Sequence, residues 1–311
     1  MRVLVYGAGA VGCFWGGLLA RHGHHVHFVA RGAQREALSA GGVRIASEVL
    51  GEVTVRPVTV SDSAAGHGPA DLILVCVKAH QTVAMLDDLG HAVGEATVLI
   101  PLQNGIETDD VLRARWGDAR VLSAVVYVGA SLQEPGIVRH VARGLLMVGN
   151  PYGVPEARVR EVLEALGAPG LQVREVREIH RERWYKLMWN ASFNAVSALT
   201  FQTTTPLLAE PNARRVIDLS MRETAAVARM LGVELTDEDV DRSLAETDRL
   251  PPIRTSMLED RERGRPMEVE ALVGAVVRRG EACGVPTPVL RTLYGLLVGM
   301  RPGPPGSPVS S

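Results

Sequence analysis

The stretch that decides the fold is "RVLVYGAGAVGCFWGGLLARHG", residues 2–23. It opens with a short apolar run typical of a buried strand, residues 2–6, and passes through "GAGAVG", residues 7–12, into a helical segment. The pattern G-x-G-x-x-G is weak alone, but a position between a strand and the start of a helix is the context that supports it. The alternative is a glycine-rich turn without a ligand. We therefore predict a dinucleotide site here.

Each glycine of the motif has its own expected role. Gly7 permits the tight turn, Gly9 lets the backbone approach a pyrophosphate, and Gly12 lets the helix pack closely on the strand. Ala10 and Val11 lie between the last two glycines, at the start of the helix. Exposed N–H groups and the positive end of the helix dipole attract phosphate at such a place. We predict that all five residues contact the cofactor.

The composition is that of a globular protein with room for two domains. The chain has 311 residues, of which 46% are hydrophobic and 22% charged, as is usual for soluble proteins. Its formal net charge of −2 gives no electrostatic reason to expect a nucleic-acid partner. The three cysteines are scattered and form no metal-ligand spacing, so we predict no metal site and a reducing compartment.

The N-terminus could be mistaken for a secretory signal, because a basic residue precedes a long apolar run. Signal peptides are rarely interrupted by so many glycines, and no polar cleavage region follows before the next apolar strand. No other stretch approaches the length of a membrane span. We therefore expect a cytoplasmic protein without a membrane partner. A homodimer is compatible with the sequence, which does not determine the oligomeric state.

Strand and helix patterns divide the chain into two halves. Short apolar runs separated by helix-length segments predict a parallel sheet buried on both faces, at 2–6, 25–30, 71–77 and 96–102. Two longer runs, 121–132 and 136–149, predict antiparallel strands appended to that sheet. Beyond about residue 175 helical periods predominate, at about 178–200, 211–231, 236–247, 253–262, 268–283 and 287–300.

These patterns predict an α/β nucleotide-type domain over 1–175 and an all-helical domain over 176–300, with a cleft between them. The last stretch, "RPGPPGSPVSS" at 301–311, has little apolar content to bury. We expect it to be disordered.

The strand at 25–30 bears on the choice of dinucleotide. In an NAD site an acidic residue near the end of this strand binds the ribose hydroxyls. Here Arg31 stands at that place and Arg35 one turn later. A guanidinium can bind a 2′-phosphate in a bidentate manner, which a carboxylate would repel. We predict NADPH as the cofactor and Arg31 as the better candidate, a solvated arginine being the alternative.

Two loops follow strands on the side where such sheets bind ligands. Lys78 and Gln81 lie just past the strand at 71–77, and Asn104 follows the next strand within "PLQNGIE". The Asn-Gly pair could simply form a turn. Because both loops end strands of one sheet, we predict cofactor contacts for all three side chains.

The helix around "WYKLMWNASFNAVSALT", residues 184–200, carries a narrow polar stripe on an apolar body. A four-residue step advances only about 40° around an α-helix, so Lys186, Asn190, Asn194 and Ser197 share one side. An exposed stripe is the plain alternative, but a solvated face is normally broader and more charged. We predict that the stripe borders a polar cleft. An amine beside amides suits carbonyl reduction, because lysine can stabilise and protonate the oxygen that receives negative charge.

A second group of polar residues lies in "SMLEDRERGRPMEVE", residues 256–270. Ser256 and Asp260 are one helical turn apart, and Glu268 falls in the first turn of the next helix, where a carboxylate suits the dipole. A capped helical hairpin with a charged loop explains this pattern equally well.

Taken together, the motifs resemble those of the ketopantoate reductases (2-dehydropantoate 2-reductases). The likeness covers nearly all of residues 1–300 and includes "GAGAVG", "VKAHQT", "QNGIE", "HVARG", "RWYKLMWNASFNAVSAL" and "GVPTPVLRTLYGL". It implies NADPH-dependent reduction of ketopantoate to pantoate in pantothenate biosynthesis. It also implies an N-terminal Rossmann-type domain with a C-terminal all-helical domain, as in 6-phosphogluconate dehydrogenase-like folds.

The resemblance also implies roles for individual residues. Lys186 matches the general acid and Glu268 the essential carboxylate. The family's substrate-binding positions are matched by Asn190, Asn194 and Ser256, and a residue between cofactor and substrate is matched by Asn104. A cofactor-side pair is matched by Lys78 and Gln81, and the 2′-phosphate ligand by Arg31.

The chain differs from the family pattern near the expected substrate pocket. Ile253 stands where some members have an asparagine on the substrate, Thr255 and Glu259 replace a serine and a glutamine, and "VEALVG" follows Glu268. These differences leave a second hypothesis open, in which the substrate is another 2-oxo acid. A third is a nicotinamide-binding sensor without turnover, against which the retention of Lys186 and Glu268 argues.

Overall fold

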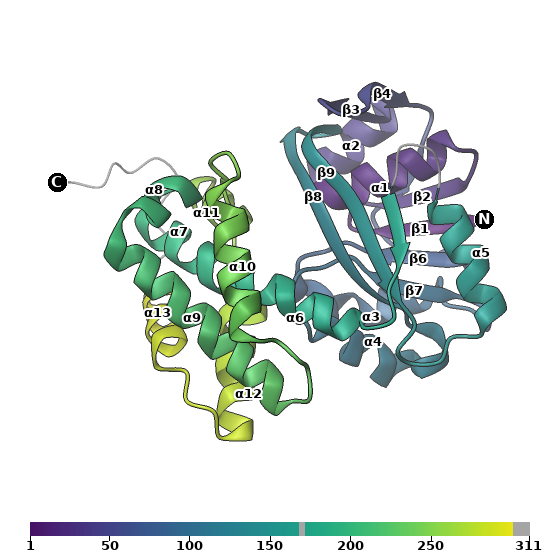
Figure 1. The fold of residues 1–311 in the computed structure, drawn as a ribbon. Coiled ribbons are helices and arrows are strands. Elements are labelled where there is room, and N and C mark those ends of the chain that lie inside the picture. Colours follow the sequence, from purple (N-terminus) through teal and green to yellow (C-terminus); the bar gives the residue numbers. More distant parts are fainter. Residues whose placement is uncertain (168–171, 301–311) are drawn as a thin grey trace. The chain divides into compact units, whose positions relative to one another are not determined.

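The computed structural model describes residues 1–167 and 172–300, and its chain divides into two units (Figure 1). The first comprises Met1–Gln103 and Glu107–Ile179, and the second comprises Asn104–Ile106 and the chain from His180 onward. The tail at 301–311, for which we predicted disorder, lies outside the described residues.

The first unit is built on a five-stranded parallel sheet of order β5-β2-β1-β6-β7. Its strands are β1 (Arg2–Tyr6), β2 (His25–Val29), β5 (Thr59–Ser61), β6 (Leu72–Val75) and β7 (Val98–Pro101). All residues of β6 and β7 are buried, as expected where helices cover both faces of a parallel sheet. The predicted parallel sheet is confirmed, with β5 as an edge strand that the sequence patterns did not reveal.

The side chains of each strand alternate between two cores. Val3 and Val5 join one cluster of buried residues with Phe28, whereas Leu4 and Tyr6 join another. The first cluster includes residues of α1 (Ala10–Arg21), α2 (Gly32–Gly41) and α5 (Glu156–Leu166), and the second those of α3 (Thr82–Gly90) and α4 (Thr108–Trp116). Two short 3-10 turns, η1 (Ala79–Gln81) and η2 (Asp118–Arg120), complete the connections.

A second sheet lies in the same unit, with the order β10-β9-β3-β4 and with β8 paired to β9. Its strands are β3 (Val43–Ser47), β4 (Gly51–Val55), β8 (Ser123–Glu134), β9 (Ile137–Gly149) and β10 (Gln172–Glu175). The antiparallel pairing of β8 and β9 is confirmed. Val121, the first residue of the predicted run, forms an isolated bridge with Leu99 of β7. The predicted place of the strands themselves on the first sheet is wrong, because β9 pairs in parallel with β3 and β10 instead.

Helix α1 explains why two sheets form. It is apolar on both sides, and residues of both sheets join its core cluster. A Cβ on Gly16 would lie 2.6 Å from Phe28 of the first sheet, and one on Gly17 would lie 3.0 Å from Val43 of the second. The two glycines therefore allow the two sheets to approach neighbouring faces of one helix closely, because consecutive helical residues lie about 100° apart. This buried role accounts for the apolar segment that resembles a signal peptide.

The described residues of the second unit from His180 to Met300 form helices joined by loops, without a strand. Its elements are α6 (Ile179–Trp189, which begins at the unit boundary), η3 (Asn190–Asn194), α7 (Ala195–Thr200), α8 (Thr204–Ala209), α9 (Pro211–Met230), α10 (Asp237–Asp248), α11 (Ser256–Glu262), η4 (Glu270–Gly274), α12 (Ala275–Cys283) and α13 (Pro288–Gly299). Within the described ranges, none of the helices is long and apolar enough to cross a membrane.

Three of the predicted helices differ from the structure. The helices predicted over 178–200 and 268–283 are each interrupted by a π-helical turn, η3 and η4. The helix predicted from 253 begins only at Ser256, because the prolines at 251–252 precede it and the side chain of Thr255 caps it by accepting from the Leu258 N–H. Helix α8 was not predicted; at 6 residues it is short for detection by periodicity.

Candidate functional site

The glycine motif forms the tight loop between β1 and α1. Gly7 has a φ of +103°, and a Cβ there would lie 2.7 Å from the backbone nitrogen of Val77. A Cβ on Gly12 would lie 2.2 Å from the Gly7 carbonyl oxygen, so helix and loop touch at this point. A Cβ on Gly9 would meet nothing within 4 Å. Gly9 thus faces open space, as a backbone that approaches a pyrophosphate must.

The first turn of α1 is suited to an anion. Gly9 is the N-cap and has no side chain to cap the helix, and the first turn contains no acidic residue. Its leading N–H groups, which include those of Ala10 and Val11, therefore have no side-chain cap from Gly9. The loop fits the pyrophosphate of a dinucleotide.

Arg31 lies at the end of β2, next to Asp62 from the end of β5. It is exposed, and its Nε donates to the Asp62 carbonyl oxygen at 3.5 Å. The Asp62 carboxylate is paired with Arg35, whose Nη1 lies 3.0 Å from Oδ2. This carboxylate is thus neutralised by a neighbouring guanidinium, which reduces its repulsion of a phosphate near Arg31. The arrangement suits a 2′-phosphate.

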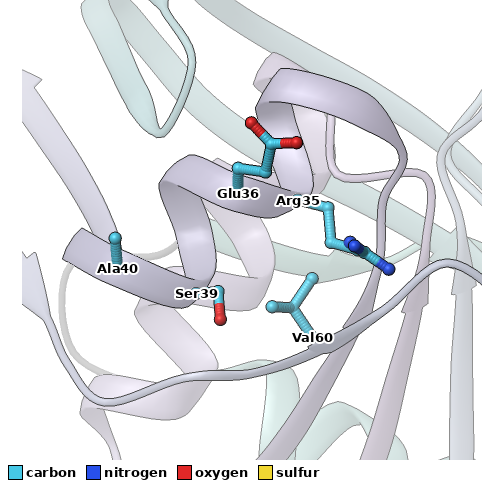
Figure 2. A pocket seen from close by; sticks show the side chains of 5 residues that line it. All are labelled: Arg35, Glu36, Ser39, Ala40 and Val60. Atoms are coloured by element: carbon cyan, nitrogen blue, oxygen red, sulfur yellow. The ribbon is translucent and has the colours of Figure 1, made fainter.

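A pocket of about 400 Å³ lies beside Arg35, between α2 and β5. Figure 2 shows its lining, in which Arg35 and Glu36 extend in different directions from α2. The lining residues are Arg35, Glu36, Ser39, Ala40 and Val60. Of these, Arg35 was the weaker of the two candidates for the 2′-phosphate in the sequence, and the others were not predicted as site residues. Because the lining carries one cation and one anion, its charge does not favour an anionic ligand.

Lys78 and Gln81 are held together at the start of η1. The Gln81 side chain accepts a hydrogen bond from the Lys78 backbone N–H at 3.2 Å. The turn places both residues directly after the segment that follows β6. Both residues follow β6 in the chain, as the sequence patterns predicted, while their contact with a cofactor stays a prediction.

Asn104 joins two predicted catalytic side chains within the second unit. Its Oδ1 accepts a hydrogen bond from Lys186 Nζ at 3.0 Å, and its Nδ2 donates to Glu268 Oε2 at 3.3 Å. Glu268 is only 7% exposed. The three residues are 82 and 164 positions apart in the chain. We call this set the Lys–Asn–Glu chain.

The π-helical turn η3 carries both asparagines of the stripe. A π turn bonds i to i+5, so a four-residue step falls short of a full turn, whereas in an α-helix it exceeds one. We predicted that each four-residue step moves the stripe by the same small angle around the helix axis, and this is wrong after Asn190. The step from Asn190 to Asn194 moves in the opposite sense, so Asn194 projects in nearly the same direction as Lys186. Ser197 does not extend the site, because its hydroxyl donates to the Gln202 carbonyl oxygen at 2.5 Å.

Asn194 shows that this stripe is not a solvated face. It is 1% exposed, and neither amide atom finds a hydrogen-bond partner among the described residues. Burying an unpaired amide costs about 2–7 kcal/mol. Asn190 is also buried, with 7% exposure. The unpaired amide of Asn194 is suited to a bound polar ligand.

Ser256 is the first residue of α11 and is exposed, whereas Asp260 in the same helix is buried. Both lie in the second unit with the Lys–Asn–Glu chain. The capped start of α11 fits the alternative of a structural helix end.

One residue that the sequence patterns did not single out contacts this region. Arg183 of α6 donates to the carbonyl oxygen of Gly105, which follows Asn104 directly. A basic residue one turn before Lys186 on an apolar helix was the available signal.

No group of three or more histidine, cysteine or acidic side chains that could hold a metal occurs in residues 1–167 and 172–300.

Comparison with known proteins gives matches over both units. The family model described as "Ketopantoate reductase PanE/ApbA" matches residues 3–152, and "Ketopantoate reductase PanE/ApbA C terminal" matches residues 178–301. The 2-dehydropantoate 2-reductase of Mesorhizobium japonicum is 33% identical over 318 residues, which cover 96% of this chain and 97% of that protein.

Solved structures agree. The 2-dehydropantoate 2-reductase from Methylococcus capsulatus is 36% identical, with a TM-score of 0.86 over 96% of each chain. The one from Geobacter metallireducens is 31% identical, with a TM-score of 0.91 over 96% of this chain and 99% of that chain.

Proposed function

Because this chain belongs to the ketopantoate reductase family of NADPH-dependent oxidoreductases, we propose that it reduces ketopantoate to pantoate with Lys186 as the proton donor. The family models cover both units, so the cofactor-binding and helical parts are each accounted for. The substrate is a small molecule.

The observation that carries the proposed mechanism is the Lys–Asn–Glu chain. A lysine that serves as a general acid needs its amine held in one direction. The Asn104 carbonyl oxygen accepts from Nζ, and the Asn104 amide is in turn oriented by the buried Glu268. Such chains of hydrogen bonds polarise one another and fix the direction of each donor.

When bound, NADPH supplies the hydride. The remaining work falls to the side chains of this protein. As negative charge develops on the carbonyl oxygen of the substrate, the Lys186 ammonium stabilises it and then donates a proton from Nζ. Asn104 keeps Nζ aligned before and after the transfer. Glu268 would repel a substrate carboxylate, so we assign it to orienting Asn104 and to a substrate hydroxyl.

The amides and the serine bind the substrate in this proposal. Asn194 gains partners for its buried amide, and Asn190 lies one turn from Lys186 on the same helix. Ser256 contributes a hydroxyl from the start of α11. Neutral amides orient a polar substrate without adding charge next to the ammonium of Lys186.

The cofactor is held by the first unit in this proposal. Gly7, Gly9 and Gly12, with Ala10 and Val11, bind the pyrophosphate, and Arg31 binds the 2′-phosphate. Lys78 and Gln81 form the cofactor-side pair, joined by the hydrogen bond from the Lys78 backbone N–H to the Gln81 side chain.

The test is the loss of NADPH absorbance on addition of ketopantoate, with NADH and other 2-oxo acids in parallel. Lys186→Met keeps the length of the side chain but removes the proton donor, and we expect kcat to fall about 10²–10⁴-fold. Arg181→Met, on the same helix but paired with Asp239, serves as the matched control and should retain wild-type kcat. An undiminished kcat in Lys186→Met would remove Lys186 from the mechanism.

We further propose that the protein is cytoplasmic and homodimeric. Its three cysteines are free thiols, which suits a reducing compartment. A ketopantoate reductase from Staphylococcus aureus, 23% identical, is described as dimeric. Light scattering on the purified protein tests the dimer, and a monomer mass at micromolar concentration would reject it.

A further inference from the structure

Arg183 is a buried cation one helical turn before Lys186. It lies on α6 and is 6% exposed. Removing a guanidinium from water is costly unless its donors are used, so a buried arginine generally has a specific task. Lys186 lies three positions later, so both side chains project from neighbouring places on the same helix.

The hydrogen-bond partner of Arg183 shows what this task is. Arg183 Nη2 donates to the Gly105 carbonyl oxygen at 3.1 Å. Gly105 has a φ of +93°, and a Cβ there would lie 2.8 Å from the Ala271 carbonyl oxygen in η4. The next residue, Ile106, is buried in the core of the second unit. The segment 104–106 is thus held at its backbone by Arg183 and at its end by the core.

This anchoring determines where the Asn104 side chain lies. Helix α6 forms hydrogen bonds to two consecutive residues. Lys186 donates to the Asn104 side chain, and Arg183 donates to the Gly105 backbone carbonyl. Without the second contact, the peptide after Asn104 could rotate and its amide could leave Lys186 or Glu268. Displacements of about 1 Å in catalytic groups can cost about 10²-fold in rate.

We propose that Arg183 is a positioning residue, which acts on Lys186 and Glu268 through the Gly105 carbonyl and the Asn104 amide. This inference rests on the proposed function for its kinetic consequence, but not for its structural one. A residue that only stabilises the helical unit would affect stability and leave the Lys–Asn–Glu chain unchanged.

The kinetic test is a double-mutant cycle on kcat. Arg183→Met should lower kcat about 10-fold, with little change in the KM for NADPH. In an Asn104→Ala background the same substitution should lower kcat by less than about 2-fold, because the residue through which it acts is gone. Arg183→Lys keeps a donor for the same carbonyl and should recover part of the rate. Additive effects in the cycle would overturn the proposal.

A second readout does not depend on turnover. The chain contains two lysines, Lys78 and Lys186, so protein labelled with ¹³C at lysine Cε gives two assignable NMR signals. Arg183→Met should move the Lys186 signal toward its position in Asn104→Ala and leave the Lys78 signal in place. If Arg183→Met leaves the Lys186 signal at its wild-type position, the proposal is overturned, and the same holds if Asn104→Ala does so. This outcome counts even if ketopantoate proves not to be the substrate.

A matched variant on the same helix serves as a control for effects of the substitution on folding. Arg181→Met removes an arginine from the same helix, and its partner Asp239 lies on α10, outside the Lys–Asn–Glu chain. It should leave the Lys186 signal and kcat unchanged. If Arg183→Met does not fold, Arg183→Lys supplies the same cycle and spectra with a smaller expected change. Wild-type protein without ketopantoate turnover would instead count against the proposed function.

Discussion

Replacing Gly9 by alanine separates cofactor binding from stability. Gly9 has φ −76° and ψ −165°, an extended conformation open to any residue, and its added Cβ would meet nothing within 4 Å. The folded protein should therefore accept the methyl group without strain. Because alanine has less conformational freedom than glycine in the unfolded chain, we expect a gain of about 0.4–1 kcal/mol in the free energy of unfolding.

The same methyl group would occupy the space through which a pyrophosphate approaches the backbone. A hydrogen bond to a charged group contributes about 1.5–3 kcal/mol. Loss of one such bond to a phosphate oxygen would raise the Kd for NADPH about 10- to 100-fold. Gly9→Ala should thus be at least as stable as the wild type and yet bind the cofactor poorly.

Calorimetric titration with NADPH and thermal unfolding without cofactor give the two quantities. Gly12→Ala is the comparison, because its Cβ would lie 2.2 Å from the Gly7 carbonyl oxygen. It should lose about 1–3 kcal/mol of stability as well as affinity. A Kd for Gly9→Ala within about 2-fold of the wild-type value would refute the placement of the pyrophosphate at this loop.

Three further predictions concern other residues. Arg31→Ala should raise the KM for NADPH about 10- to 100-fold and leave that for NADH nearly unchanged, since only NADPH carries the 2′-phosphate; steady-state kinetics with both cofactors decides this. Burial raises the pKa of Asp239, but the Thr236 backbone N–H and nearby arginines outweigh it and lower the pKa overall. Asp239→Asn should therefore lower the free energy of unfolding by about 1 kcal/mol at pH 7, and this difference from the wild type should vanish as the pH falls through the lowered pKa. Urea unfolding at pH 7 and at acidic pH measures the difference, and a value that does not change with pH would contradict the reasoning. Burial raises the pKa of Cys13 to about 12, so in the folded protein Cys13 should resist alkylation at pH 8 and react after Cys283, as peptide mass spectrometry can show.

Local patterns sufficed for the first sheet and the nucleotide loop. The strands β1, β2, β6 and β7 are short, mainly apolar runs between turn residues, a pattern that follows from burial on both faces of the sheet. The roles of Gly7, Gly9 and Gly12 followed from spacing, because each is a backbone constraint within six residues. The second sheet could not be placed in this way, since β9 pairs with β3 and β10 from distant parts of the chain.

Periodicity located the polar stripe but not its winding. The π-helical η3 spans only 5 residues within a longer helical run, so the sequence patterns predicted one continuous helix. The true winding became visible only from the backbone hydrogen bonds. It brings Asn194 back toward the direction of Lys186.

The sequence by itself predicted the chemistry proposed for this chain, with a glycine loop for a dinucleotide, an arginine for a 2′-phosphate, and a lysine among amides for a carbonyl. Only the tertiary structure decided that Asn104 belongs with Lys186 and Glu268, and that Arg183 holds the Gly105 carbonyl beside it. The physical reason is separation along the chain. Local patterns record what each segment can bury or expose, whereas hydrogen bonds between residues 82 and 164 positions apart exist only after the segments have packed.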